Sequence, residues 1–283
     1  MKKLLPLLLC AALLTACSAN IDMKTEPDNT ESIITGESET LTGLTEEPSV
    51  KPVSGLESLS VKKIKWGHGE IINHRPPEEP SRLNKDYFDL DGEWLLSDGK
   101  KLALTFDEGY ENGFTPSILD TLKEKNVKAV FFVTYDFARD NPELVQRMLD
   151  EGHTVGNHSY HHYAMDELDT QTAREEIDFL HRYIRDKYNY TMSYFRFPMG
   201  EFSEKSLAIA QSLGYKSVFW SYAYADWDPE SQPEPDRAFA SICESTHPGE
   251  IMLLHAVSKT NAEILAKVID DVRAQGYTFT TEL

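Results

Sequence analysis

The sequence predicts an α/β fold in which a parallel sheet is wrapped by helices. Strand-like and helical segments alternate from residue 101 to the end of the chain, which is the pattern of repeated β/α units. The alternation fits either an open sheet or a closed barrel. Six or seven units favour a (β/α) barrel that is distorted or incomplete. The 283 residues are ample for one such domain and its hydrophobic core.

Each expected element follows from local composition. Apolar, β-branched and aromatic runs predict strands at 101–106, 128–133, 193–197, 216–220, 250–255 and 277–280. Amphipathic segments predict helices at 115–125, 142–151, 165–187, 203–213, 236–244 and 261–275. Pro116 lies in the first turn of the first helix, and Gly152, Gly214 and Gly276 follow helices at C-cap positions.

The first 17 residues predict a bacterial export signal. Two lysines precede a leucine-rich run that ends in small residues and is too short to span a bilayer. The sequence Leu14-Thr15-Ala16-Cys17 resembles a lipobox, in which cleavage before the cysteine frees it for lipidation. We therefore expect a lipid anchor at Cys17 on the outer face of the bacterial cytoplasmic membrane. Ordinary secretion with an incidental cysteine is the alternative.

Residues 18–60 predict a disordered acidic linker. They hold nine acids, two lysines and no aromatic residue, so they cannot bury enough apolar surface to offset the entropy of ordering. Residues 61–100 look irregular and predict an arm laid over the catalytic domain, which we place at 101–283.

Charge and cysteine content exclude some classes of function. The formal net charge of −19 makes nucleic acid a poor partner. Cys10 leaves with the signal and Cys17 would carry lipid, so Cys243 remains alone. This excludes an intramolecular disulfide and a cysteine-based zinc site. We expect the mature protein to be a monomer.

Polar side chains gather at the C-terminal ends of the expected strands. They are Asp107 and Glu108, His158, Arg196, Asp226 and His255. In parallel β/α folds these strand ends converge on one face, which holds the active site. We therefore expect these side chains to meet there.

His158 and His162 are the best metal signal in the chain. They are four residues apart in HSYHH, and on a helical turn that spacing puts both imidazoles on one face. Neutral imidazole suits zinc and its neighbours, and a carboxylate would complete a two-His-one-carboxylate site. A solvated surface pair is the alternative. The nearby Asp107 and Glu108 favour the metal.

Five segments resemble, in order, the motifs of the polysaccharide deacetylases, carbohydrate esterase family 4, also called the NodB-homology domain. They are TFDEGYENG at 105–113, NHSYHH at 157–162, RFPMG at 196–200, ADW at 225–227 and LLH at 253–255. The sequences NHRPP and LLHAVSKTNAE add a resemblance to the delta-lactam-biosynthetic de-N-acetylases of spore-forming bacteria. This implies hydrolysis of the acetyl group of N-acetylmuramic acid in peptidoglycan, leading to muramic δ-lactam.

The resemblance also implies a role for each catalytic residue. Asp107 would be the general base that takes a proton from the attacking water, and Arg196 would hold it ionised. His255 would be the general acid that protonates the leaving amine, and Asp226 would orient it.

The metal ligands implied by the family are His158 and His162, with Glu108 standing where relatives usually have Asp. The metal would be zinc, with cobalt, manganese and magnesium as alternatives. The longer Glu108 side chain predicts altered metal affinity.

The remaining implied roles concern substrate. The backbone N–H near Met199, beside Pro198, would help hold the oxyanion. Trp227 would wall the site.

Two rival functions stay open from the sequence. One is a deacetylase of N-acetylglucosamine units in peptidoglycan or another glycan. The other is a non-catalytic glycan-binding relative whose metal site has decayed through Glu108. The intact Asp107, Arg196, Asp226 and His255 favour catalysis, because a binding module needs neither a base nor an acid.

Overall fold

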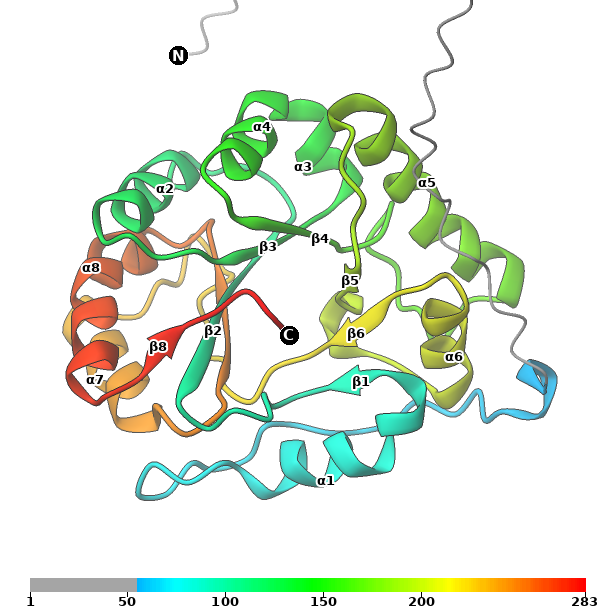
Figure 1. The fold of residues 1–283 in the computed structure, drawn as a ribbon, viewed down its shortest axis with the longest axis horizontal. Helices are drawn as coiled ribbons and strands as arrows, with labels where there is room; N and C mark the ends of the chain where they lie inside the picture. Colours follow the sequence, from blue (N-terminus) through cyan, green and yellow to red (C-terminus); the bar gives the residue numbers. More distant parts are fainter. Residues whose placement is uncertain (1–54) are drawn as a thin grey trace, which may run out of the picture. The chain divides into compact units, whose positions relative to one another are not determined.

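The computed structural model describes residues 55–283. The expected export signal, Cys17 and most of the expected linker lie outside the described residues. The strands form one parallel sheet in the order β1-β6-β5-β4-β3-β2-β7, with β8 also paired to β2. The sheet curves into a ring, and helices surround it (Figure 1). The prediction of a distorted (β/α) barrel is confirmed.

The strands are short and lie close to the expected apolar runs. They are β1 Gly92–Glu93, β2 Lys101–Glu108, β3 Val130–Val133, β4 Thr154–Asn157, β5 Tyr194–Phe195, β6 Lys216–Val218, β7 Ile251–His255 and β8 Thr278–Phe279. A direct ladder between β6 and β7 is missing, but isolated bridges join Tyr222 to Met252 and Leu95 to Glu250. These bridges draw the two ends of the curved sheet together.

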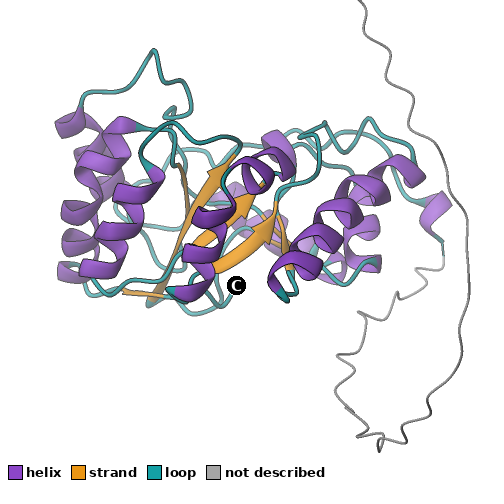
Figure 2. Cartoon of the chain, turned by 90° about the horizontal axis from the view of Figure 1, so that it is seen from above, coloured by secondary structure: helices purple, strands orange, loops and turns teal. Residues whose placement is uncertain are grey.

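The helices cover the outside of the strands (Figure 2). They are α1 Glu78–Asp86, α2 Thr115–Glu124, α3 Tyr135–Asp140, α4 Pro142–Asp150, α5 Thr170–Tyr188, α6 Glu204–Ser212, α7 Pro235–Ser245 and α8 Lys259–Ala274, with 3-10 turns at Leu56–Ser58, Phe88–Leu90 and Pro198–Gly200. None of the helices between residues 55 and 283 has the length and apolar character needed to cross a lipid bilayer.

The prediction that residues 61–100 form an irregular arm is wrong for their second half. Helix α1 begins after Pro77 with two acids in its first turn, which favours a helix N-terminus. Strand β1 then joins the barrel by pairing with β6. Trp94 is fully buried and stacks on Phe219 with ring centroids 4.1 Å apart. This segment is therefore part of the barrel wall. A two-residue strand paired with a distant one leaves no local signal.

Three other boundaries differ from expectation. Ordered structure starts before residue 61, because Leu56–Ser58 form a 3-10 turn and the Lys205 N–H donates to the Ser60 carbonyl. Helix α3 was not predicted. Helix α5 starts at Thr170 and not at 165, because the Asp169 side chain accepts from two backbone N–H groups and caps it there.

Because side chains alternate along each strand, they form two layers, one inside the barrel and one facing the helices. On β2, Ala103 packs inside the barrel with Val130, Phe132, Val218 and Ile251. Leu102, Leu104 and Phe106 instead belong to the larger core between sheet and helices. Because successive strand residues point to opposite faces, odd-numbered positions of β2 face inward and even-numbered positions face the helices.

We expect Gly156→Ala to destabilise the barrel. Gly156 lies on β4, where a Cβ would sit 2.5 Å from Cδ1 of the buried Phe132 ring. The ring cannot yield freely, since the Arg196 guanidinium carbon lies 4.1 Å from its centroid. The cost should be about 1–3 kcal/mol of unfolding free energy, measured by urea denaturation. Gly67→Ala is the control, because no atom lies within 4 Å of its added Cβ. Equal stability of the two variants would contradict this packing.

Candidate active site

Four of the residues predicted from the sequence converge at one end of the barrel, because each stands in or directly after a strand, at a position whose side chain points inward. Asp107 and His255 are register partners at the ends of β2 and β7. His158 directly follows β4 and Arg196 directly follows β5, and both occupy positions whose side chains point into the barrel. Asp107, His158 and His255 border a cavity of about 480 Å³ together with neighbouring loops, and Arg196 is buried behind Asp107. Its lining residues are Asp107, Gly109, Tyr110, His158, His162, Met199, Trp220, Ala223, Tyr224, Trp227, Leu253, His255 and Val257.

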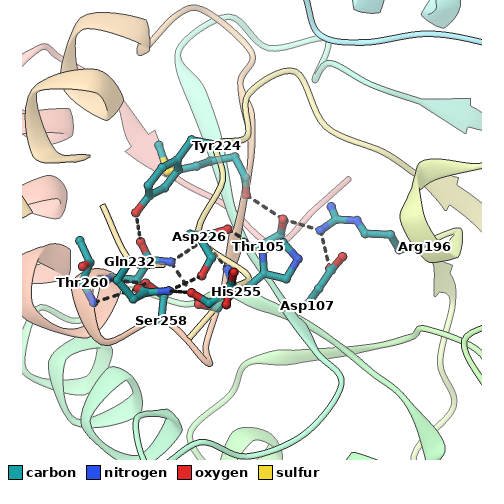
Figure 3. A network of polar contacts seen from close by, with 12 residues as sticks. Thr105, Asp107, Arg196, Tyr224, Asp226, Gln232, His255, Ser258 and Thr260 are labelled. Carbon is teal, nitrogen blue, oxygen red and sulfur yellow. Dashed lines mark hydrogen bonds and ion pairs between the residues drawn. The ribbon is translucent and has the colours of Figure 1, made fainter. Parts of the chain in front are cut away.

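Arg196 lies at the centre of the barrel end and is fully buried. Its Nη1 donates to Asp107 Oδ1 at 2.9 Å and to Thr105 Oγ1 at 2.8 Å. Its Nε and Nη2 donate to the carbonyls of Val218 and Phe219 at 3.1 and 3.0 Å. The guanidinium is thus held by β2 and by the end of β6, and Figure 3 shows its contacts with Thr105 and Asp107 on β2. A buried charge is tolerated only when it is paired and hydrogen-bonded in this way.

The Asp107 carboxylate is buried, and burial alone would raise its pKa. The charge of Arg196 opposes burial, with smaller contributions from His158 and His255. The net effect is a pKa below the ordinary value of an aspartate. Asp107 is therefore ionised at neutral pH, as a general base must be.

His255 lies beside Asp107, and its surroundings shift its pKa in the opposite direction. Its Nδ1–H donates to Asp226 Oδ1 at 2.7 Å, and its backbone N–H donates to Asp226 Oδ2 at 2.8 Å. Burial lowers the pKa of the imidazole, but the hydrogen bond and charge of Asp226 outweigh it. The pKa of His255 is raised. A base and an acid with separated pKa values therefore line the same cavity.

His158 and His162 come together, but not on a helix. They lie in a loop after β4 in which Ser159 and His162 adopt φ of 70° and 60°. The Ser159 side chain accepts from the His162 N–H at 2.9 Å and closes the loop. The two Nε2 atoms are 3.2 Å apart. The expectation of a helical turn is wrong, although the convergence that it predicted occurs.

Both imidazoles of this pair are neutral at pH 7. Burial lowers the pKa of His158 to about 4, and it also lowers the pKa of His162. The His158 Nδ1–H donates to the Arg196 carbonyl at 2.9 Å, which leaves its Nε2 lone pair facing His162. Neutral imidazole with an oriented lone pair is the form that binds a metal.

Comparisons with known proteins agree with this geometry. A family model described as polysaccharide deacetylase matches residues 97–218. The peptidoglycan-N-acetylmuramic acid deacetylase PdaA of Bacillus subtilis is 42% identical over 228 residues, which cover 79% of this chain and 86% of that protein. The chain belongs to the polysaccharide deacetylase family.

Two further comparisons place the chain within carbohydrate esterase family 4. A solved structure of Bacillus subtilis PdaA, a family 4 carbohydrate esterase, superposes with a TM-score of 0.75 at 40% identity over 78% of this chain and 96% of that one. The peptidoglycan-N-acetylglucosamine deacetylase PgdA of Listeria monocytogenes is 34% identical over 182 residues, covering 64% of this chain and 38% of that protein.

Glu108 is the residue that the resemblance implied as the carboxylate ligand of the metal. Its side chain has the outward parity of β2, is fully buried, and accepts from Thr115 Oγ1 of α2 at 3.4 Å. Burial and the nearby Glu111 raise the pKa of this carboxyl well above its ordinary value. The structure therefore does not place Glu108 with His158 and His162 in the way the resemblance implied.

The His pair alone fits a metal ion. Two nitrogens bound to one tetrahedral zinc at about 2.0–2.1 Å lie roughly 3.3 Å apart, close to the 3.2 Å between the two Nε2 atoms. Among residues 55–283, however, no three His, Cys, Asp or Glu side chains form a group able to hold a metal. The nearest carboxylate oxygen to the pair is Oδ2 of Asp107, 3.5 Å from His158 Nε2.

Of the residues expected to touch substrate, Met199 and Trp227 lie on the rim of the cavity and Pro198 is buried. Met199 and Trp227 line the cavity and are more than half exposed. Met199 adopts a left-handed φ of 58°, which presents this turn toward the cavity. Pro198 is buried and does not line the cavity, so it acts through the turn it begins. Tyr110, also on the rim, follows the base in TFDEGY.

Sequence analysis missed the polar residues behind His255. Asn261 donates to the Asp226 carboxylate, Gln232 donates to the Asp226 backbone carbonyl, and the Tyr224 hydroxyl donates to Asn261. The motif LLHAVSKTNAE contains one of them, but its spacing alone gave no role. The segment 73–77, which precedes α1, is turned toward α7, where His74 Nδ1 donates to the Thr246 carbonyl at 2.8 Å. None of residues 61–77 lines the cavity.

We expect Glu108→Gln to stabilise the protein above pH 5. The raised pKa means that folding disfavours ionised Glu108, so stability falls as pH rises above the unfolded-state value. Gln keeps the shape and the contact with Thr115 but cannot ionise. Urea denaturation at pH 5 and pH 8 should show a gain that is larger at pH 8. A loss of stability at pH 8, or an equal effect at both pH values, would contradict a buried, neutral Glu108.

Proposed function

We propose that the protein hydrolyses the N-acetyl group of N-acetylmuramic acid in peptidoglycan and so prepares the formation of muramic δ-lactam. One observation carries the proposal: Asp107 and His255 face one cavity with their pKa values shifted in opposite directions. The likeness to PdaA of Bacillus subtilis, over 86% of that protein, supports the substrate class.

The reaction needs a base and an acid at opposite ends of one intermediate. Asp107 accepts a proton from water as the water oxygen bonds to the acetyl carbonyl carbon. The backbone N–H of the turn at Met199 donates to the resulting oxyanion. His255 gives its proton to the amide nitrogen as the C–N bond breaks. The products are acetic acid, which ionises to acetate, and a free amine, and the proton held by Asp107 returns to His255 through solvent.

The rim suits a sugar better than a flat apolar ligand. Trp227, Tyr110 and Met199 are exposed around the cavity and can pack against pyranose faces. The Trp227 ring lies 6.1 Å from the His255 ring, so a sugar stacked on it would bring its substituent to the acid. None of residues 61–77 lines the cavity, although Trp66 packs behind it against the lining residue Trp220, with ring centroids 5.0 Å apart.

The chemistry of the product favours N-acetylmuramic acid as the substrate. It carries a lactyl carboxyl near its nitrogen. Once the acetyl group is gone, the amine can close on that carboxyl to give a six-membered lactam. An attached stem peptide would block the carboxyl, so peptide removal comes first.

We further propose that His158 and His162 hold a divalent cation, with zinc first and cobalt, manganese or magnesium as alternatives. Such an ion supplies Lewis-acid polarisation of the carbonyl when bound. The two neutral imidazoles support this, and the family is metal-dependent in general. With Glu108 turned toward α2, binding should be weaker than in a site with three protein ligands.

Elemental analysis tests the metal. Protein purified without chelators should contain up to one divalent ion per chain, and His162→Ala should lose it because only His158 remains. Dialysis against a chelator should lower acetate release, and zinc should restore it. Full activity of a protein shown to hold no metal would sink this part of the proposal.

The proposed place of action is the outer face of the bacterial cytoplasmic membrane, with the mature protein a monomer anchored through Cys17. The lipobox-like Leu14-Thr15-Ala16-Cys17 supports an anchor, and a peptidoglycan substrate lies on that side. Cys17→Ala should leave the precursor uncleaved or move the protein out of the membrane fraction. Unchanged processing and unchanged partition would refute the anchor.

A panel of glycans tests the activity and the substrate together. Intact peptidoglycan, amidase-treated peptidoglycan and chitin oligomers are each offered, and acetate and lactam are measured. We expect acetate release from amidase-treated peptidoglycan above all. Release from chitin oligomers with none from amidase-treated peptidoglycan would move the protein to the N-acetylglucosamine class. No release from any glycan would leave a non-catalytic glycan-binding protein.

Two variants link the release to the site. Asp107→Asn and His255→Ala should each lower kcat by at least about 10²–10⁴-fold, the usual contribution of one proton-transfer group. The control is His161→Ala, because His161 makes its side-chain contact with Glu176 and not with the cavity. Activity retained in Asp107→Asn would contradict its role as base.

A further inference from the structure

Part of the LLHAVSKTNAE segment has no role in the chemistry described above. Ser258, Thr260 and Asn261 form the N-terminus of α8, yet each is at least 96% buried. Polar side chains at a helix N-terminus commonly face solvent or cap the helix. Ser258 does cap α8 by accepting from the Asn261 N–H at 3.1 Å. The side chains of Asn261 and Ser258 also reach toward Asp226.

Every polar atom of the Asn261 amide is used around His255. Its Nδ2 donates to Asp226 Oδ2 at 2.6 Å and to the His255 carbonyl at 3.1 Å. Its Oδ1 accepts from the Tyr224 hydroxyl. A carboxylate and a carbonyl can only accept hydrogen bonds, so the amide cannot flip. Asn261 therefore joins the helix α8 to both members of the His255–Asp226 pair.

These contacts decide which oxygen of Asp226 meets the imidazole. Oδ2 receives the Asn261 amide and the His255 backbone N–H, while Oδ1 receives the His255 Nδ1–H. With two donors on Oδ2, rotation of the carboxylate would break both bonds. Asp226 is completely buried, so water cannot replace a lost donor.

A second clamp holds the loop that carries Asp226. The Gln232 Nε2 donates to the carbonyls of Asp226 and Asp228 at 2.9 and 2.8 Å. The Gln232 Oε1 accepts from the Ser258 hydroxyl and, at 3.4 Å, from the Thr260 N–H. Figure 3 shows Gln232, Ser258 and Thr260 gathered behind Asp226 on the side away from Arg196.

We propose that Asn261 and Gln232 are positioning residues for the general acid. Asn261 fixes the Asp226 carboxylate so that Oδ1 holds the His255 imidazole in its Nδ1–H form, with Nε2 presented to the cavity. Gln232 fixes the backbone from which Asp226 extends. The role in turnover rests on the proposed function, whereas the orientation of His255 rests on these contacts alone.

The expected effect follows from the groups that surround His255. These are Asp226, Asp107 and Arg196, and burial favours the neutral imidazole. Without Asn261, Asp226 Oδ2 keeps only the His255 backbone N–H, so the carboxylate is held less firmly, the hydrogen bond that opposes burial weakens and the fraction of protonated His255 falls. The alkaline limb of the pH–rate profile, where the acid loses its proton, should then move to lower pH.

Asn261→Ala is the first test, since Ala is well tolerated in a helix. We expect kcat to fall by about tenfold to hundredfold, the value of one hydrogen bond to a charged group, with KM changed by less than about threefold. Nitrogen-15 NMR of the imidazole should show a lower His255 pKa. Asn84→Ala is the matched control, because the Asn84 side chain also makes three hydrogen bonds, all with backbone groups, but lies on α1.

Gln232→Met is the second variant and protects the test against a folding defect. It keeps roughly the size and adds no charge, but it removes the amide, so both loop carbonyls and the Ser258 hydroxyl lose their partner. We expect the same direction in kcat and in the His255 titration. Asn84→Ala should lower stability without moving either the pH profile or the imidazole titration.

Two results would overturn the proposal. One is an unchanged His255 titration in both folded variants. The other is an equal shift in Asn84→Ala, which would mark a general structural effect. The imidazole titration needs no substrate, so it also separates this proposal from the proposed function. Wild-type protein that releases no acetate while Asn261→Ala still shifts His255 would refute only the function.

Discussion

The ion pair between Arg196 and Asp107 is the interaction on which the active site depends. Both side chains are inside a barrel that also holds the apolar cluster of Ala103, Val130, Phe132, Val218 and Ile251, and each is costly there without the other. Arg196 also binds the carbonyls that follow β6 and the hydroxyl of Thr105. One guanidinium therefore fixes the charge of the base, the position of β5 and the closure of the barrel near the cavity.

The rest of the site follows from strand register. Parallel pairing of β2 with β7 puts His255 beside Asp107, and the same inward parity brings in His158 after β4. Loops then add the groups that tune these residues. Asp226 raises the pKa of His255 while Arg196 lowers that of Asp107, so the surroundings favour the protonated form of one group and the ionised form of its neighbour. This separation is what amide hydrolysis requires of a base and an acid.

The sequence allowed the convergence of these residues to be predicted, because alternating β/α units bring strand ends together. It did not allow four features to be predicted. Glu108 was expected beside the His pair, yet alternation on β2 turns it toward Thr115. The left-handed residues Ser159 and His162 replace a helical turn. Strand β1 is too short to leave a pattern. Asn261 lies 35 positions from Asp226, and only the folded chain shows their contact.

The most direct test of this account is a double-mutant cycle on the ion pair, with unfolding free energies measured by urea denaturation. Arg196→Met and Asp107→Asn should each cost about 3–5 kcal/mol, because each leaves a buried polar partner unpaired. The double variant should be less destabilised than the sum of the single variants by about 1–3 kcal/mol. Additive effects within about 0.5 kcal/mol would contradict the claim that this pair organises the site.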